Sequence, residues 1–303
     1  MRSLIGVIIL CLLVGVLQSD DNNQQKPWLT GTLLISQTTV TKRGDVLIQP
    51  YINVISEISA PNVIIINPQL FLCIGLTEWM DINLTLQDVY KKSGKAQAFY
   101  PGDTSVGFDF QLISGEDKGY PSLLLSLEEI APTGHYQQLS PNKKGTDSTG
   151  MGSWTSIAYL TLYQLFSLEN KHFLSAALFF SYGVSAPVTL KDFNTYGGAF
   201  HTTGRVFPGN SLTTCLSFEY TLTKNWVLAL DSRYTHQDYT RFKGMELNRL
   251  GARSTNQLSF APAIEYNFND HMGVIAGAWF SAWGTEVSRF TGGIIMLYYE
   301  YSS

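Results

Sequence analysis

Apolar residues occupy every second position in residues 216–234, LSFEYTLTKNWVLALDSRY, on both sides of a short polar break. The apolar side chains stand at even positions: Leu216, Phe218, Tyr220, Leu222, Trp226, Leu228, Leu230 and Tyr234. The odd positions carry mostly polar side chains: Ser217, Glu219, Thr221, Thr223, Asp231 and Arg233. Successive side chains of a strand point to opposite faces of its sheet, so the pattern predicts two strands, each with one apolar and one polar face.

Strands of this kind occur in soluble antiparallel sheets and in outer-membrane β-barrels. The 303 residues are 15% charged and 13% aromatic, against about 25% charged residues in ordinary soluble domains. Beyond the amino terminus, no stretch is long and apolar enough for a membrane-spanning helix. This composition favours a barrel, because barrel strands place lipid-facing residues only at alternate positions. A soluble sandwich is the structural alternative.

The amino terminus has the pattern of a secretory signal. Arg2 precedes the apolar run of residues 4–17, which ends abruptly in polar residues. This run is shorter than the about 20 residues of a spanning helix, so we predict a signal peptide, residues 1–19, cleaved after Ser19. An uncleaved anchor is the main alternative. Cys11 would suit a lipoprotein, but Leu10 stands where a small residue is needed.

Period-two patterns predict an all-β fold: a transmembrane, antiparallel up-and-down β-barrel of about 12 strands in residues 45–303. Residues 20–44 would form a periplasmic segment, which could plug the barrel mouth, or a short additional strand. An even count suits single-chain bacterial barrels, whose termini both lie on the periplasmic side. The predicted strands cover residues 45–56, 68–76, 79–90, 104–114, 121–132, 153–168, 172–187, 211–223, 226–240, 256–268, 271–284 and 290–302.

The connections between the predicted strands alternate in length. Tight breaks occur at residues 77–78, 169–171, 224–225 and 269–270. Long polar connections lie between them, at residues 57–67, 91–103, 133–152, 188–210 and 241–255. Short periplasmic turns and long extracellular loops produce this order in outer-membrane barrels, whereas a soluble sandwich has no reason to sort its loops in this way.

Aromatic residues gather beside the tight breaks, which predicts a girdle at the lipid–water interface. The alternative is that large residues simply begin and end strands. The predicted girdle consists of Trp79, Phe166, Tyr220, Trp226, Tyr266 and Phe268.

Two stretches resemble known outer-membrane proteins. Residues 294–302, IIMLYYEYS, are similar to the terminal strand by which such barrels are recognised for assembly, although Ser302 and Ser303 replace the usual final aromatic residue. The opening residues 28–31, WLTG, followed by Gly44, Asp45, Pro50 and Tyr51, resemble the start of the meta-pathway phenol degradation (MetA-pathway) family. Further short matches follow in residues 76–79, 102–103 and 131–134. The resemblance implies an outer-membrane channel or transporter, sometimes linked to the uptake of hydrophobic or aromatic compounds, and carries no catalytic residues.

Charged residues on the polar phase of the strands would face the lumen. An excess of carboxylates there would favour cations or polar neutral solutes over anions. The alternative is that these groups hydrogen-bond to one another and fill a narrow barrel without a conducting path. The predicted lumen-lining residues are Asp81, Asp109, Glu128, Glu219, Asp231, Arg233, Glu265 and Glu300.

Catalysis and cofactor binding have little support in the sequence. Outer-membrane lipid hydrolases use Ser and His near the outer end of a strand, but neither His201 nor His236 has a serine at a matching spacing. We therefore expect no enzyme activity, no cofactor and no metal site. Cys73 and Cys215 fall on the polar phase of their strands and suggest no disulfide. A net charge of -4 argues against a nucleic-acid partner.

The sequence as a whole predicts a passive channel or porin in the outer membrane of a Gram-negative bacterium. Its expected partners are outer-membrane lipid, the barrel assembly machinery and a small-molecule solute, hydrophobic or aromatic. The alternative is a non-conducting surface barrel whose long loops bind a partner.

Overall fold

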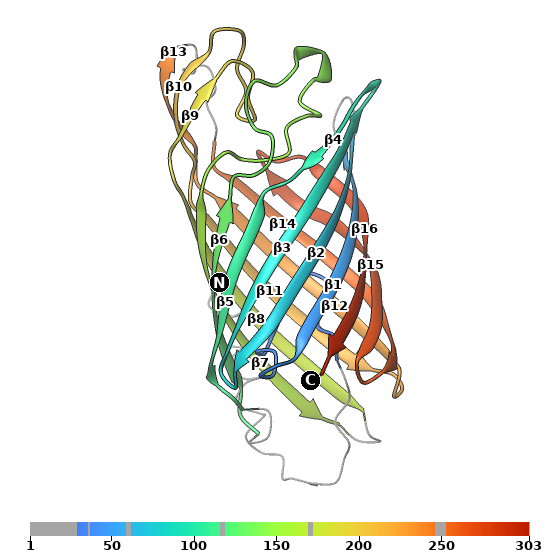
Figure 1. The fold of residues 1–303 in the computed structure, drawn as a ribbon. Helices are drawn as coiled ribbons and strands as arrows, with labels where there is room; N and C mark the ends of the chain where they lie inside the picture. The colour runs from blue at the N-terminus through green and yellow to red at the C-terminus, as the bar shows by residue number, and fades with distance from the viewer. Residues whose placement is uncertain are drawn as a thin grey trace.

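The computed structural model describes residues 29–35, 37–58, 62–115, 119–168, 172–245 and 253–302. These residues form a closed antiparallel β-barrel with long connections at one end and short turns at the other (Figure 1). The predicted signal peptide lies outside the described residues. No helix in the described part of the chain is long and apolar enough to cross a membrane.

Twelve strands form the wall, as the sequence predicts. Each pairs with its neighbours in chain order, and β1 pairs with β16 to close the barrel. The wall strands are β1 (Val46–Ile58), β2 (Val63–Thr77), β3 (Met80–Ser93), β5 (Thr104–Ile113), β6 (Ser122–Ala131), β7 (Thr155–Ser167), β8 (Phe173–Ser185), β11 (Ser211–Thr221), β12 (Trp226–Gln237), β14 (Thr255–Asn269), β15 (Met272–Thr285) and β16 (Arg289–Tyr301).

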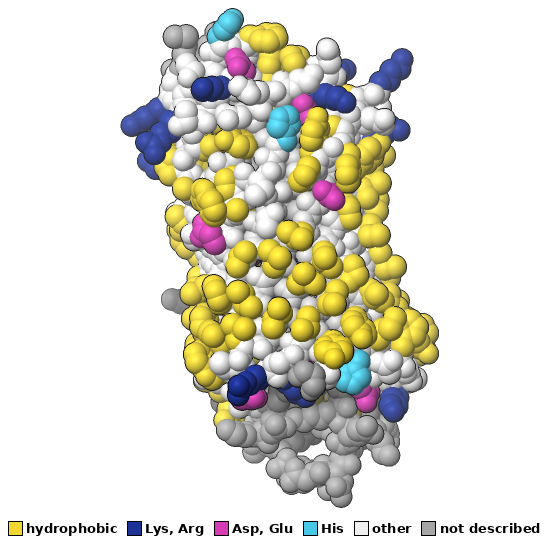
Figure 2. Space-filling model, viewed as in Figure 1, with side chains coloured by type: hydrophobic (Ala, Val, Ile, Leu, Met, Phe, Trp, Pro, Cys, Tyr) yellow, Lys and Arg dark blue, Asp and Glu magenta, His cyan; other side chains and the backbone are white. Residues whose placement is uncertain are grey.

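The alternation in the sequence is the alternation between the inside and the outside of this wall. In β12, Val227 and Asp231 are buried inside the barrel, whereas Leu228 and Leu230 are more than 40% exposed on its outer surface. On the face shown in Figure 2, hydrophobic side chains gather over the middle of the outer surface, and Lys and Arg lie toward its two ends. The outer surface therefore suits contact with lipid.

Four short strands lie in connections that the sequence analysis treated as loops. Strand β4 (Ala96–Pro101) extends the outer end of β3 as a hairpin, while β9 (Val188–Lys191), β10 (Thr203–Phe207) and β13 (Arg241–Met245) form a separate sheet. The loop between β6 and β7 contains a short 3-10 helix, η2 (Pro141–Lys143). These strands have at most six residues, too few for a clear period-two signal.

Residues 29–44 are not a wall strand. Their described part lies inside the barrel as irregular backbone and reaches the wall just before β1, where Gly44 N donates to Gly75 O (2.9 Å) and Gly75 N donates to Asp45 O (3.1 Å). We call residues 29–44 the N-terminal segment.

Candidate functional site in the barrel lumen

Side chains of the wall hold the backbone of the N-terminal segment. An irregular segment has amide N–H groups without ladder partners, and burying such groups unpaired is costly. Four of them donate to oxygens that project inward from different wall strands: Thr30 N to Glu265 Oε1 (3.3 Å), Leu34 N to Asp231 Oδ2 (3.0 Å), Val40 N to Gln111 Oε1 (3.2 Å) and Thr41 N to Asp81 Oδ2 (2.7 Å). Three of these acceptors are carboxylates that the sequence predicts in the lumen.

Two apolar side chains anchor the same segment against the inside of the wall. Leu33 packs in a buried cluster with residues of β12, β14, β15 and β16, among them Ile275 and Met296. Ile35 packs in a second cluster with Tyr163 and Cys215, from β7 and β11. The two clusters adjoin along the strands from β7 to β16, whereas Val40 and Thr41 bond to β5 and β3, so the segment crosses the lumen.

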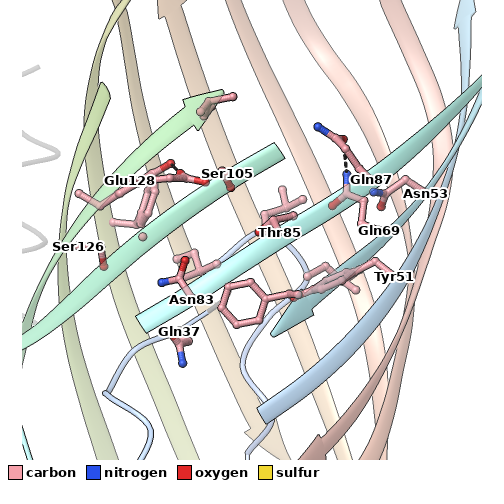
Figure 3. Close-up of a pocket in the computed structure, with 18 of the residues that line it drawn as sticks. Gln37, Tyr51, Asn53, Gln69, Asn83, Thr85, Gln87, Ser105, Ser126 and Glu128 are labelled. Atoms are coloured by element: carbon pink, nitrogen blue, oxygen red, sulfur yellow. Dashed lines mark hydrogen bonds between the residues drawn. The ribbon is translucent and has the colours of Figure 1, made fainter. Parts of the chain in front are cut away.

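A cavity of about 570 Å³ lies beside the N-terminal segment. The segment contributes four residues to its lining, and the wall contributes the rest. Polar side chains without charge dominate one side: Asn53, Asn67, Gln69, Asn83, Thr85, Gln87 and Ser105. Figure 3 shows Asn53, Gln69 and Gln87 together at one end of this space, with Ser126 and Glu128 across from them.

The amides on this side are ordered by one another and by the backbone. Gln69 donates to Asn67, whose Nδ2 donates to Asp88 O (2.7 Å). Gln87 Nε2 donates to Asp103 O (2.7 Å) at the outer mouth. An amide has two donors and two acceptor lone pairs, so a row of amides can bind many neutral polar groups.

Aromatic, apolar and charged side chains form the rest of the lining. Trp279 is oriented by a hydrogen bond from its Nε1 to Ser259 Oγ (3.1 Å), and the rings of Tyr159 and Phe179 lie 5.3 Å apart between centroids. Leu34 and Ile35 of the segment add apolar surface. The cavity therefore offers both amide groups and aromatic rings to a solute.

The predicted lumen-lining residues divide into two groups. Asp109, Glu128 and Arg233 line the cavity, and Tyr159 Oη donates to Glu128. The others lie outside its lining: Asp81, Asp231 and Glu265 are fully buried and contact the N-terminal segment, Glu219 is buried and accepts from Ser175 Oγ (2.8 Å), and Glu300 is half-buried opposite Leu47. The sequence analysis missed the amide side of the cavity, because Asn and Gln occur singly on strands that only the fold brings together.

The residues of the predicted girdle lie near the short turns. This is the end of the barrel at which β1 starts and β16 ends. Trp226 contacts Tyr266 (centroids 4.7 Å apart), and Tyr266 contacts Phe268 (5.1 Å). On neighbouring strands, Tyr220 stacks on His172, and Trp79 is 54% exposed beside Phe110. Phe166 is half-buried near the end of β7.

One group of described residues could hold a metal ion. Cys73 Sγ and carboxylate oxygens of Asp81 and Asp109 lie within 4.8 Å of one another. A mixed sulfur and oxygen donor set suits a borderline-soft divalent ion such as Zn²⁺. The N-terminal segment already supplies donors to the sulfur, from Thr41 Oγ1 (3.3 Å) and Gln37 Nε2 (3.5 Å). Cys73 and Cys215 are free thiols.

The long outer connections pack over the barrel as ordered structure. Val188, Leu190 and Val206 form a buried cluster with Tyr136 and Tyr196 beside it. The hydroxyl of Tyr196 donates to Met151 O (2.9 Å). Burial, with a smaller contribution from the nearby negative charge of Asp103, raises the pKa of Tyr196 to about 12. This hydroxyl therefore stays protonated and can donate at all physiological pH values.

Among the described residues, the histidine at the outer end of β12 has an asparagine and an aspartate as its side-chain partners. His236 Nδ1 lies 2.8 Å from Asn256 Oδ1, and its Nε2 lies 3.3 Å from Asp238 Oδ1. The side chain of His236 is partly buried, and that of Asp238 is about half exposed. A general base acts on a nucleophile within hydrogen-bond reach, such as a serine hydroxyl. The two partners of His236 are instead an amide oxygen and a carboxylate oxygen.

Solved structures resemble this fold, although no protein-family model and no curated protein matches the sequence. The COG4313 outer membrane channel from Pseudomonas putida F1 has a TM-score of 0.65 at 13% identity, covering 89% of this chain and 99% of that chain. The translocator domain of the autotransporter NalP from Neisseria meningitidis has a TM-score of 0.45 at 12% identity, covering 99% and 96%. The TodX monoaromatic hydrocarbon channel mutant deltaS2S3 has a TM-score of 0.43 at 11% identity, covering 87% and 91%. The first similarity covers nearly the whole length of both chains. This protein therefore has the fold of an outer-membrane β-barrel.

Proposed function

We propose that this protein is a channel of the Gram-negative outer membrane for small solutes, with the N-terminal segment occupying part of its lumen. The observation that carries the proposal is the cavity of about 570 Å³ inside the closed wall. Its fold is similar to that of the COG4313 outer membrane channel, which supports the proposal. A solute that combines an aromatic ring with hydrogen-bonding groups would contact both the aromatic rings and the amides of the cavity lining.

Conductance in planar bilayers tests the channel. We expect discrete current steps from the mature chain, and larger steps from a variant that lacks residues 20–40, because removing the segment widens the path. Heat-modifiable mobility in electrophoresis is the control that both chains have folded. Two folded barrels without any conductance would refute the channel and leave the second candidate, a non-conducting barrel whose outer loops bind a partner. The hydrogen bonds that hold the segment across the lumen favour that candidate.

Permeation into vesicles tests the solute class. A purely polar pore passes methyl glucoside faster than the larger phenyl glucoside. A cavity lined partly by aromatic rings should pass phenyl glucoside at least as fast as methyl glucoside. The variant Trp279→Ala should remove this advantage of phenyl glucoside while leaving the flux of methyl glucoside unchanged. Faster passage of methyl glucoside in the unsubstituted protein would refute the aromatic preference but not the channel.

A further inference from the structure

The short sheet of β9, β10 and β13 carries four cations on one face. Directly paired residues share a face, and side chains alternate along each strand. The registers Thr203 with Lys191 and Arg205 with Lys243 therefore place all four cations on the same side. All four are exposed. We call this surface the outer basic face: Lys191, Arg205, Arg241 and Lys243.

The opposite face of the same sheet is apolar and covered. Leu190 and Val206 are completely buried, and Phe242 packs beside them. The sheet cannot turn over without exposing this cluster, whose burial is favourable. The outer basic face is therefore held in one orientation, pointing away from the covered side.

The sheet that carries this face lies at the outer end of the barrel, next in the chain to the wall strands β8, β11 and β12. The order β9, β10, β13 repeats the order β8, β11, β12 of the wall strands that lead into these elements. On the outer surface of β8, Tyr182 and Val184 are 45% and 48% exposed just before the chain reaches β9. Figure 1 places the small sheet at the end of the barrel with the long connections, and Figure 2 shows Lys and Arg gathered there, directly beyond the hydrophobic side chains.

The cations of the outer basic face lie close together without acidic partners in their own sheet. Arg205 stands directly opposite Lys243, an arrangement that is unfavourable for like charges. The two arginines and Lys243 all lie within 5.8 Å of the centroid of the Phe207 ring. The sequences of the three strands, VTLK, TGRVF and RFKGM, contain no carboxylate. An anion between these side chains would offset their repulsion.

We propose that the outer basic face binds the phosphate groups of lipopolysaccharide in the surrounding outer leaflet. Arginine matches phosphate with paired N–H donors, and clusters of Lys and Arg beside a membrane surface bind anionic headgroups. Lipopolysaccharide is the anionic lipid of this leaflet, and its phosphates lie at the boundary between acyl chains and sugars. The small sheet begins at β9, directly after the apolar outer residues Tyr182 and Val184 of β8, at the outer end of the barrel.

Binding of purified lipopolysaccharide to the folded full-length mature barrel in nanodiscs of zwitterionic lipid tests the proposal. We expect the triple variant Arg205→Gln, Arg241→Gln, Lys243→Gln to bind about 100-fold more weakly, since each cation near a membrane surface contributes a factor of about five. The single variant Lys243→Gln should lose about five-fold. Dephosphorylated lipopolysaccharide should bind the unsubstituted protein as weakly as intact lipopolysaccharide binds the triple variant.

A second triple variant removes the same formal charge elsewhere: Lys92→Gln, Lys95→Gln, Lys224→Gln, at three exposed positions outside the outer basic face. This control should keep the affinity of the unsubstituted protein. Equal losses in the two triple variants, or undiminished binding of the dephosphorylated lipid, would overturn the proposal. Displacement of the lipid by millimolar inorganic phosphate would also overturn it, because it would assign the face to a free anion.

Discussion

At the scale of single residues, Gly75 determines how closely the N-terminal segment approaches the wall. A Cβ at this position would lie 1.8 Å from Lys42 O, so Gly75→Ala must displace the backbone of the segment. We expect a loss of about 1–3 kcal/mol in the free energy of unfolding, the usual cost of overpacking, measured by urea titration in lipid vesicles. Gly293→Ala is the matched control, because its Cβ would meet its nearest atom at 3.5 Å. Equal stability of the two variants would show that the segment yields freely.

At the scale of one element, neighbouring positions of β3 face different environments. Leu86 is 42% exposed on the outer surface, and Thr85 lines the cavity. We expect Leu86→Arg to lower the free energy of unfolding in lipid vesicles by about 2–4 kcal/mol, the cost of a lipid-facing cation near the midplane of a bilayer. Thr85→Arg should cost less, since the added charge meets a polar cavity. A larger loss for Thr85→Arg would reverse the assignment of the two faces.

At the scale of the whole molecule, the seam between β1 and β16 closes the barrel. Ile52 and Ile295 are directly paired across it, and both are 47% exposed. In the double variant Ile52→Cys, Ile295→Cys we expect a disulfide that keeps β1 joined to β16 on heating. It would be seen as an altered electrophoretic mobility that a reductant reverses. Ile52→Cys with Tyr299→Cys should not crosslink, because Tyr299 pairs with Ile48. Crosslinking of the second pair instead would indicate a shifted register.

The sequence predicts the wall far better than the contents of the lumen. All twelve predicted wall strands are confirmed, most with bounds within two residues, because each strand repeats the same alternation along its own length. Strand β2 starts five residues before its predicted start, at Val63 instead of residue 68. The run VIIIN begins there with four consecutive apolar residues. Both faces of the strand are therefore apolar, and no period of two is visible.

The candidate site depends on contacts that no local pattern contains. Asp231 and Glu265 stand on the predicted inward phase, but their acceptor role requires Leu34 and Thr30, which are 197 and 235 residues away in the chain. Likewise, Asn67 and Gln87 look like isolated polar residues until the pairing of β2 with β3 brings them within 3.2 Å.

The sequence by itself determined the strand pattern and the closed antiparallel barrel, because a period of two is local and lipid on one side enforces it. Only the tertiary structure decided what the inward side chains do. Buried carboxylates accept hydrogen bonds from the N-terminal segment, because an irregular backbone inside a barrel must satisfy its N–H groups. The space that this segment leaves is the cavity, whose lining combines amides with aromatic rings.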